Sequence, residues 1–290
     1  MRKSREDSIF GAFTIAVVVV IALACLLPFL YIVSMSFSGK NAVLRNEVFL
    51  WPVDFDLTAY KAVFNNQSLS RSMWFSMWLT VVYTLVSLII TVLCAYPLSR
   101  THLQFKKPLL VYIIITMYFS GGMIPVFLNI RDLGLLDNFW ALVLPSCLST
   151  YNMILMRSFF AAMPKEMEES AFVDGANDLT VLTRIILPLS KASIATVGLF
   201  YAVSRWNGFM DSLLYINTES MYTIQVRLRQ LIQSSQVTAL MEDIPEFKTS
   251  LISETIKAAC LVFSMIPVML MYPWLQRYFV KGTMIGSLKG

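Results

Sequence analysis

Six long apolar runs divide the 290-residue chain. A helix needs about 20 predominantly apolar residues to cross the hydrocarbon core of a bilayer. The chain is 57% hydrophobic and 14% charged, whereas a soluble domain has roughly 25% charged residues. We therefore predict an all-α membrane protein with six transmembrane helices, in which residues 1–290 form a single transmembrane domain. The predicted spans cover approximately residues 12–37, 74–98, 108–130, 139–160, 192–216 and 255–279.

Two of these runs carry features that bear on how they fold. The first follows a basic N-terminus as in a signal peptide, but it is too long and lacks a small-residue cleavage site, so we predict an uncleaved span. The third is interrupted by Gly121, Gly122 and Pro125. Because such a break is tolerated only beside other helices or a cavity, we expect this span to lie in the protein interior. Residues 38–73 and 217–253 are predicted loops, the first with a short helix near 57–64.

The distribution of Lys and Arg predicts the orientation in the membrane. If the N-terminus is cytoplasmic, the inside segments hold 13 of the 23 basic residues and the longer outside segments hold 8. Basic residues are enriched in cytoplasmic loops. This predicts a multi-pass protein of the cytoplasmic membrane with both termini in the cytoplasm. The net charge of +5 is explained in the same way and does not indicate nucleic-acid binding.

Residues 164–188, between the fourth and fifth spans, form a polar stretch that is patterned like folded protein. Acidic residues occupy its first turns, where the helix dipole favours negative charge. Gly175 supplies a stop for a first helix, and Asn177 or Asp178 can cap a second one over 179–186 that ends before Pro188. The pattern predicts a helix-turn-helix on the cytoplasmic side. Taken alone, it also fits an amphipathic hairpin lying on the membrane surface.

The same stretch resembles the Glu-Ala-Ala loop of ABC importer permeases. That motif has Glu-Ala-Ala, a glycine four residues after the second Ala, and a final Ile-x-Leu-Pro. The residues that match, with Ser170 as the one departure, are Glu169, Ser170, Ala171, Gly175, Ile185, Leu187 and Pro188. The resemblance implies that Glu169, Ser170, Ala171 and Gly175 belong to the coupling helix that docks on an ATPase. Met167 and Phe172 share its apolar stripe and are candidates for additional anchors, or they pack against the protein's own spans.

Further segments resemble the carbohydrate branch of these permeases, especially the subgroup for complex-polysaccharide fragments. They are Tyr96–Arg100, Ser120–Pro125, Leu133–Asp137, Trp206-Asn207 and the tail from Tyr278. The resemblance implies a permease that takes up a sugar, such as an oligosaccharide from a polysaccharide, by ATP-driven alternating access. Its implied partners are a second homologous permease, two copies of a cytoplasmic ATPase and an external solute-binding protein, all at the bacterial cytoplasmic membrane.

The sequence predicts no enzymatic site in this chain. It contains no GxxxxGK[ST] phosphate loop, so ATP and Mg are expected on the partner ATPase and no cofactor is expected here. The four cysteines are widely separated within apolar runs and there is one histidine. These counts disfavour a disulfide framework, a metal site and a membrane-embedded enzyme.

Polar residues of the fifth span are the candidates for the substrate path. Ionisable residues inside a membrane are costly and mark functional sites by default. Asn207 and Asp211 are four residues apart and should share a helix face, and two aromatic rings could stack on a sugar. The candidate set is Tyr201, Arg205, Trp206, Asn207 and Asp211. Arg205 would suit an acidic sugar such as a uronate oligomer, but it could instead pair with a neighbouring helix, with Asp211 at the interface.

Two other functions remain open at this point. One is an ABC permease for a non-sugar solute, such as a peptide, or for a lipoprotein-linked sugar. The other is a secondary transporter driven by an ion gradient, a class that often shows inverted repeats and charged sites at the membrane midplane. No convincing repeat is present and intramembrane acids are scarce, which disfavours the second alternative.

Overall fold

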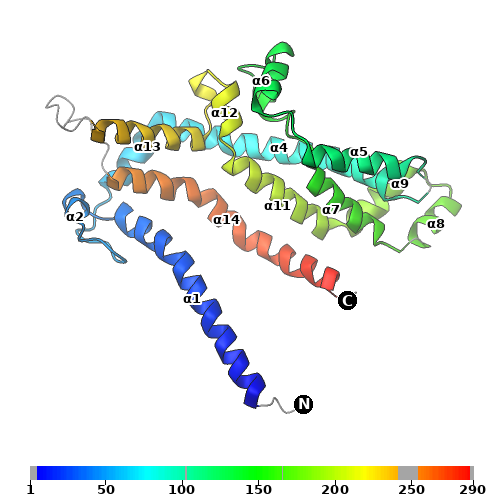
Figure 1. Cartoon of the computed structure of the whole chain (residues 1–290), viewed down its shortest axis with the longest axis horizontal. Helices are drawn as coiled ribbons and strands as arrows, with labels where there is room; N and C mark the ends of the chain where they lie inside the picture. Colours follow the sequence, from blue (N-terminus) through cyan, green and yellow to red (C-terminus); the bar gives the residue numbers. More distant parts are fainter. Residues whose placement is uncertain (1–4, 102, 165, 241–253, 288–290) are drawn as a thin grey trace. The chain divides into compact units, whose positions relative to one another are not determined.

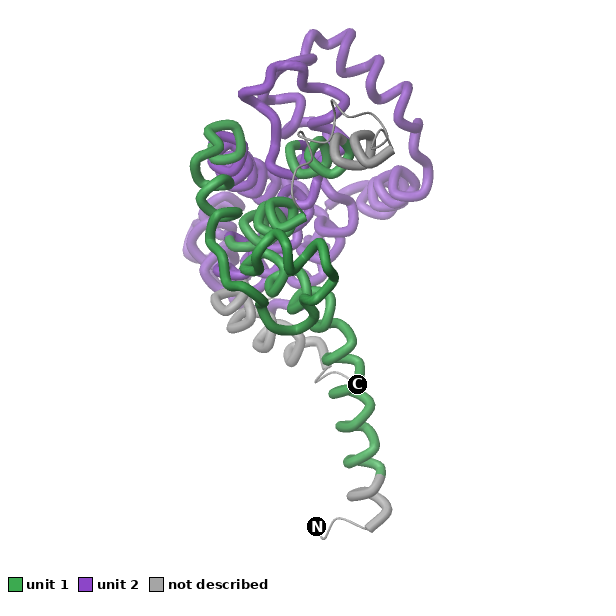
Figure 2. Tube along the Cα trace, turned by 90° about the vertical axis from the view of Figure 1, so that its left-hand side faces the viewer, with its two compact units in different colours: residues 1–70, 227–266 green, residues 71–226, 267–290 purple. Residues whose placement is uncertain are grey.

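The computed structural model describes residues 5–101, 103–164, 166–240 and 254–287, and these residues form helices, turns and loops without a strand. Figure 1 labels their helices, and Figure 2 shows the two compact units into which they fall. One unit comprises residues 1–70 and 227–266, and the other comprises 71–226 and 267–290. The prediction of an all-α protein is confirmed for the described residues.

Among the described residues, three helices are long and apolar enough to cross a membrane. They are α1 (Arg5–Ser36), α4 (Gln67–Ser99) and α14 (Glu254–Ser287), and they coincide with the first, second and sixth predicted spans. Two bent helix pairs also pass this test as pairs, which gives up to five candidates by length and composition. One pair is α5 (Lys106–Tyr118) with α6 (Met123–Asp132), bent by 110°, and the other joins 178–189 to α11 (Lys191–Asn207) at 83°.

In the first unit, the segment after α1 folds back on the end of that helix. It contains α2 (Lys40–Leu44) and α3 (Thr58–Asn65), and α3 confirms the short helix predicted near 57–64. The Phe37 ring packs on the Tyr60 ring with centroids 4.7 Å apart, and the Tyr60 hydroxyl lies 2.8 Å from Ser36 Oγ. Ser34 Oγ donates to Leu50 O at 2.6 Å. These contacts fix the loop to the helix end.

The core of the second unit joins α4, α7 (Thr150–Ala161), α11 and the segment 178–189. Its fully buried side chains include Leu79, Met153, Phe160, Val181 and Tyr201. Gly198 of α11 lies so close to α4 that an added Cβ would come within 3.1 Å of Leu88 Cδ1. Small residues allow membrane helices to approach closely, so this glycine sets the separation of α4 and α11.

The third predicted span is broken at the glycines, as its sequence predicted. Gly122 has φ +87°, a conformation that other residues rarely adopt, and Pro125 lies in the first turn of α6, where an amide N–H has no intrahelical partner. No residue of α5 is buried, but Leu110 and Ile113 pack against the core of the unit and Ile130 of α6 is 2% exposed. The interior location of this span stays a prediction.

The fourth and fifth predicted spans are not continuous helices. Residues 139–160 contain the short 3₁₀ helix η1 (Phe139–Leu142), an irregular stretch with Pro145, and then the 12-residue helix α7. Ser149 caps α7 by accepting from Asn152 N, which starts the helix later than hydropathy alone suggests. In 192–216 the helix α11 stops at Asn207, and α12 (Met210–Tyr215) follows the break at Gly208.

The predicted loop 217–253 is partly helical. It contains η3 (Glu219–Met221) and α13 (Ile224–Leu240), so the loop prediction is wrong for these residues. Ile224 N donates to Ser76 Oγ at 2.8 Å, which anchors the start of α13 to α4. Because many residues of α13 are polar, the helical spacing of its apolar residues was not recognised in the sequence. The remainder of this predicted loop, 241–253, lies outside the described residues.

Candidate functional site

A polar pocket lies in the second unit where α11 breaks. Its volume is about 490 Å³. The pocket is lined from α4, α6, η1, the irregular stretch before α7, α11 and α12. The lining residues are Tyr83, Val126, Ala141, Pro145, Ser146, Ser204, Arg205, Asn207, Gly208, Phe209, Met210, Asp211 and Tyr215. The break in α11 is thus what places backbone and polar side chains beside a cavity.

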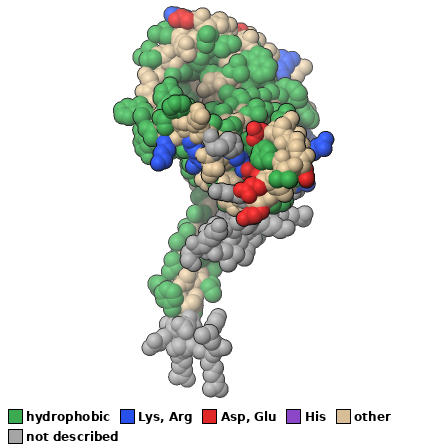
Figure 3. Space-filling view, turned by 90° about the vertical axis from the view of Figure 1, so that its right-hand side faces the viewer, with side chains coloured by type: hydrophobic (Ala, Val, Ile, Leu, Met, Phe, Trp, Pro, Cys, Tyr) green, Lys and Arg blue, Asp and Glu red, His purple; other side chains and the backbone are tan. Residues whose placement is uncertain are grey.

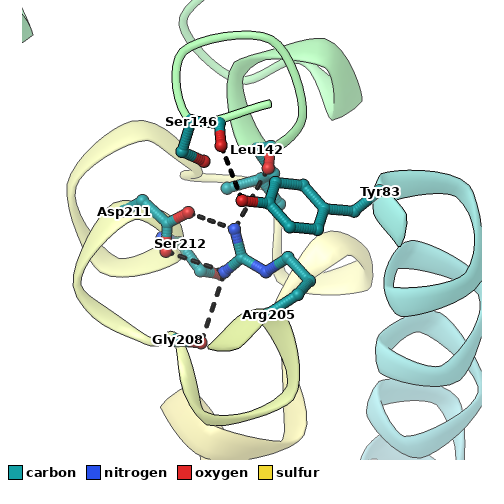
Figure 4. A network of polar contacts seen from close by, with 7 residues as sticks. All are labelled: Tyr83, Leu142, Ser146, Arg205, Gly208, Asp211 and Ser212. Atoms are coloured by element: carbon teal, nitrogen blue, oxygen red, sulfur yellow. Dashed lines mark hydrogen bonds and ion pairs between the residues drawn. The ribbon is translucent and has the colours of Figure 1, made fainter. Parts of the chain in front are cut away.

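Arg205 is the centre of a hydrogen-bond network in this pocket (Figure 4). Its Nη2 donates to Asp211 Oδ1 at 2.8 Å and to Gly208 O at 3.3 Å. Its Nη1 donates to Leu142 O at 3.0 Å and also to Asp211 Oδ2. The Arg205 side chain is 3% exposed and that of Asp211 27%. The guanidinium therefore binds the two sides of the helix break to each other and to η1.

Tyr83 of α4 completes the wall around Arg205. Its hydroxyl donates to Ser146 O at 2.6 Å, and Arg205 Cζ lies 5.7 Å from the centroid of its ring (Figure 4). A cation within about 6 Å of an aromatic ring face is attracted by it. The network thus links α4, the stretch before α7, η1 and the α11–α12 break.

The structure brings three of the predicted path residues to this pocket, Arg205, Asn207 and Asp211. The reason given from the sequence is wrong for one pair, since Asn207 and Asp211 do not share a continuous helix. A turn at Gly208 separates α11 from α12 and brings the two residues to one cavity. Asn207 is exposed, and its Nδ2 donates to Val203 O at 3.0 Å. Its amide oxygen therefore remains available on the pocket wall.

The two predicted aromatic contacts lie elsewhere. The Tyr201 ring is 1% exposed, and its hydroxyl lies 2.6 Å from Thr91 Oγ1 and accepts from Ser149 N at 3.0 Å. Trp206 is 7% exposed and lines a separate apolar cavity with residues of α4 and α14, such as Met77 and Pro267. Neither ring lines the polar pocket, because Tyr201 packs in the core of the unit and Trp206 faces the apolar cavity.

The second candidate site is the hairpin formed by residues 166–189. Its first arm is α8 (Glu166–Val173), and Gly175 follows with φ +82°. Asn177 then caps the second arm, accepting from Thr180 N at 2.8 Å. The predicted stop at Gly175 and the predicted cap at Asn177 are both confirmed.

The second arm runs further than the sequence predicted. It consists of α9 (Asp178–Val181), the π-helical segment η2 (Leu182–Ile186) and α10 (Leu187–Leu189). The predicted end before Pro188 is therefore wrong. A proline lacks an N–H and clashes with the carbonyl four residues earlier in a regular α-helix. The wider π turns lie directly before Pro188, and the second arm ends at Leu189, one residue after the proline.

The two faces of the hairpin differ in exposure. Ala171 of the first arm and Val181, Leu182 and Ile186 of the second pack on the core of the unit. The other face is open, with Glu169 and Ser170 exposed among apolar side chains. The exposed apolar residues are Met167, Phe172, Val173 and Leu179. Figure 3 views the molecule from the side where α8 lies in Figure 1 and shows acidic side chains gathered there beside apolar ones.

An ion pair joins the hairpin to the end of α4. Arg100 Nη1 donates to a carboxylate oxygen of Glu168, and the two residues are 9% and 8% exposed. Arg100 Cζ also lies 4.3 Å from the centroid of the Tyr96 ring. From the sequence, Arg100 was only part of a family segment and Glu168 only one of several first-turn acids. The position of Arg100 at the end of a predicted span did not indicate that it would form a buried pair with Glu168.

Comparison with known proteins identifies the family. A family model described as the inner membrane component of binding-protein-dependent transport systems matches residues 68–285. This range includes both candidate sites. The chain belongs to this family. It is a membrane component of a transport system and not an enzyme.

Two relatives match this permease over nearly its whole length, and one of them is a carbohydrate transport protein by name. It is 40% identical over 287 residues, or 98% of its length, to the polygalacturonan/rhamnogalacturonan transport system permease protein YtcP of Bacillus subtilis, all of which is covered. It is 41% identical over 290 residues to the protein LplC of the same organism, covering 98% of that protein. Both matches run essentially end to end.

A solved structure resembles the permease equally well. It is a chain from a bacterial ABC transporter involved in the import of the acidic polysaccharide alginate. The two chains are 37% identical, the alignment covers 96% of this permease and 99% of the solved chain, and the TM-score is 0.86. The whole fold described above is therefore that of an ABC importer permease.

Proposed function

We propose that this permease takes up an oligosaccharide released from an acidic polysaccharide, as one membrane subunit of an ATP-driven importer. The observation that carries the proposal is the end-to-end similarity, at a TM-score of 0.86, to a permease chain of an alginate importer. The relative named for polygalacturonan points to the same chemistry. Both polymers are built from uronate units, so their fragments carry a carboxylate on most rings.

The proposed assembly contains this chain, a second homologous permease, two cytoplasmic ATPases and an external solute-binding protein. ATP and Mg would be bound by the ATPases. Six spans with both termini in the cytoplasm would place residues 164–188 on the ATPase side. The three long helices and the bent pair of α5 and α6 would supply four of these spans. With 178–189 belonging to the hairpin, α11 would supply a fifth, and the stretch from η1 through α7 would supply the remaining one. This crossing, which is the fourth in chain order, would then consist of irregular chain followed by the short helix α7.

The open face of the hairpin is the proposed docking surface for the ATPase. Met167 and Phe172 are 42% and 40% exposed, and Glu169 and Ser170 lie exposed beside them. An apolar helix face that inserts into a groove is a common recognition mode. Ala171 packs on the core and Gly175 forms the turn, so both would hold the docking surface in shape instead of touching the ATPase.

The polar pocket is the proposed part of the substrate path. Among its lining residues Arg205 is the one cation, and its charge is balanced by Asp211. A uronate carboxylate would have to compete with Asp211 for this guanidinium. We therefore propose that Asn207, Ser204 and Tyr215 offer the hydrogen bonds to a passing sugar, while Arg205 and Asp211 hold the wall that presents them. Weak, distributed contacts suit a path, because a tightly bound sugar would not be released.

The test is to co-express this chain with its candidate partner permease and ATPase and to purify the assembly through a tag on this chain. ATP hydrolysis in proteoliposomes is then measured with the binding protein and with oligogalacturonates, alginate oligosaccharides or neutral oligosaccharides. We expect the ATPase to co-purify and the acidic oligosaccharides to stimulate hydrolysis most. Stimulation by a neutral sugar or a peptide alone would contradict the proposed substrate while retaining the importer.

Energy coupling is tested separately by measuring uptake into cells. Collapsing the ion gradients with ATP kept high should leave uptake intact if hydrolysis drives transport. Loss of uptake under these conditions, together with absence of a co-purifying ATPase, would favour a secondary transporter.

A further inference from the structure

A single helix connects the hairpin to the polar pocket. Tyr83 of α4 contacts Ser146 and Arg205 in the pocket wall. Arg100 follows the last residue of the same helix and pairs with Glu168 of the hairpin. At 1.5 Å of rise per residue the two positions are about 25 Å apart. Residues 67–99 form a single helix, with Pro97 in its last turn. A proline removes one intrahelical hydrogen bond, so this end of α4 needs further contacts to carry a displacement toward Tyr83.

The end of α4 is held firmly by neighbouring cations. Lys106 Nζ donates to Arg100 O at 2.7 Å and to Ser99 O at 3.2 Å. Arg157 Nε, from α7, donates to Leu98 O at 2.9 Å. Cationic side chains at a helix C-terminus satisfy its open carbonyls and its dipole. Arg100 therefore projects from a fixed point on the helix and not from a frayed end.

The Arg100–Glu168 pair is well placed to transmit movement. Both residues are more than nine-tenths buried, and Arg100 is stacked on Tyr96. Separating a buried ion pair leaves two charges without partners and is strongly unfavourable. Apolar contacts between the hairpin and the core, such as those of Ala171, are less directional and allow sliding. The ion pair thus resists a relative movement of α8 and α4 that the apolar contacts would permit.

Arg100 also interacts electrostatically with the second arm of the hairpin. Burial lowers the pKa of its guanidinium from the ordinary value, and the Tyr96 ring and the Asp178 carboxylate oppose this shift. An arginine remains charged at physiological pH even so. Asp178 begins α9, so a carboxylate from each arm of the hairpin acts on the one guanidinium at the end of α4.

We propose that Arg100 and Glu168 form the rigid link through which the hairpin moves α4 and, through Tyr83, the wall of the polar pocket. The inference rests on the proposed function, because it assumes that an ATPase moves the hairpin. Within that function it assigns force transmission to two residues outside the docking surface. Both are positioning residues, since neither touches the ATPase or the sugar.

The test compares a broken pair with a neutral pair in the complete complex. In Arg100→Met or Glu168→Leu, one buried charge loses its partner. In the double variant both charges are gone, and replacing a buried ion pair by apolar residues is often neutral for stability. Arg45→Met is the matched control, because Arg45 forms an exposed pair with Glu47 at 3.9 Å. Melting temperature, co-purified ATPase, and hydrolysis with and without loaded binding protein are measured for each variant.

We expect the double variant to melt like the wild type and to keep its ATPase, yet to lose at least five-fold of the stimulation by loaded binding protein. Each single variant should melt at a lower temperature and also lose stimulation, while Arg45→Met should match the wild type in all readouts. A purely stabilising pair predicts a different result, in which the double variant regains wild-type stimulation together with its stability. That result would overturn the inference, as would full stimulation in either single variant.

The same experiment separates this inference from the proposed function. If no ATPase co-purifies with the wild-type chain, the proposed importer assembly is wrong, and the Arg100–Glu168 link has no movement to transmit. If the wild type is stimulated and the double variant is stimulated equally, the importer stands and only the link between hairpin and α4 is refuted.

Discussion

Arg205 donates to both carboxylate oxygens of Asp211 across the break that separates α11 from α12. The pair is formed within six residues of sequence, and it exists only because the helix stops at Asn207 and turns at Gly208. A continuous helix would have placed the two side chains on different faces. In this structure Asp211 neutralises the charge that an acidic sugar would otherwise meet.

We predict that Arg205→Met mainly destabilises the permease. It leaves the Asp211 carboxylate without its counter-charge, and removing one partner of a buried pair costs about 3–5 kcal/mol. Asp211 is partly exposed, so we expect the low end of that range. The measurement is the melting temperature of the purified complex, with recovery expected in the double variant Arg205→Met with Asp211→Leu.

Asn207→Ala is the matched control in the same pocket. Asn207 is exposed, and within the described part of the chain its side chain bonds to a backbone carbonyl of its own helix, so its loss should leave the melting temperature unchanged and lower sugar uptake. The opposite pattern, in which Arg205→Met melts normally but uptake collapses, would instead make Arg205 a direct sugar contact.

A second prediction concerns Asp137, whose side chain joins the turn before η1 to the residues that follow α12. Asp137 accepts from Thr218 Oγ1 at 2.6 Å, Thr218 N at 2.8 Å and Asn217 N at 2.9 Å. These hydrogen bonds, led by that of the Thr218 hydroxyl, lower the pKa of Asp137 from its ordinary value of 3.8. A carboxyl with a lowered pKa stabilises the fold above its unfolded pKa, and the contribution disappears as the pH falls through the folded pKa.

Asp137→Asn removes the charge and tolerates the same backbone, because Asp137 has φ +55° and Asn also adopts that conformation readily. We expect the wild type to melt above the variant at neutral pH, with the difference shrinking below about pH 4. The readout is the melting temperature of both proteins between pH 3 and pH 7. A difference that stays constant with pH would show that geometry, and not charge, holds this loop.

The sequence predicted the parts of the fold that depend on local pattern. Long apolar runs became α1, α4 and α14, and the cap at Asn177 with the turn at Gly175 produced the hairpin. Contacts between distant segments were not readable in this way. Nothing near Glu168 in the sequence indicates that it is buried against Arg100, 68 residues earlier. Pairing of this kind is decided by packing of whole elements.

The sequence also misjudged where helices stop inside apolar runs. Hydropathy does not distinguish a span that ends at Gly208 from one that continues through it, because a glycine is tolerated in either case. Pro188 shows the converse, since a π-helical segment lets the helix pass a residue that normally ends it. These two positions shape the pocket and the second arm of the hairpin. The turn and the cap of the hairpin were predicted from the sequence, whereas the helix break at Gly208 and the π-helical segment before Pro188 were not.

The last prediction uses Gly175 to test the turn of the hairpin without changing any residue that is proposed to contact the ATPase. Its φ of +82° is unfavourable for residues with a Cβ, although an added Cβ would meet no atom of the described residues within 4 Å. The cost of substitution is therefore backbone strain and not a clash. A left-handed conformation costs roughly 1–2 kcal/mol for an ordinary L-residue and less for Asn. We expect Gly175→Val to disturb the turn and Gly175→Asn to preserve it.

The measurement is the amount of ATPase that co-purifies with each variant and its rate of hydrolysis. Gly175→Val should reduce both by several-fold, while Gly175→Asn, which adds a side chain of similar size at the same exposed position, should retain most of each. Equal loss in the two variants would mean that the side chain itself obstructs a partner at position 175. If both variants retained the ATPase and its activity equally, the turn would play no part in ATPase binding. Strain at Gly175 would then have no effect on the proposed docking surface.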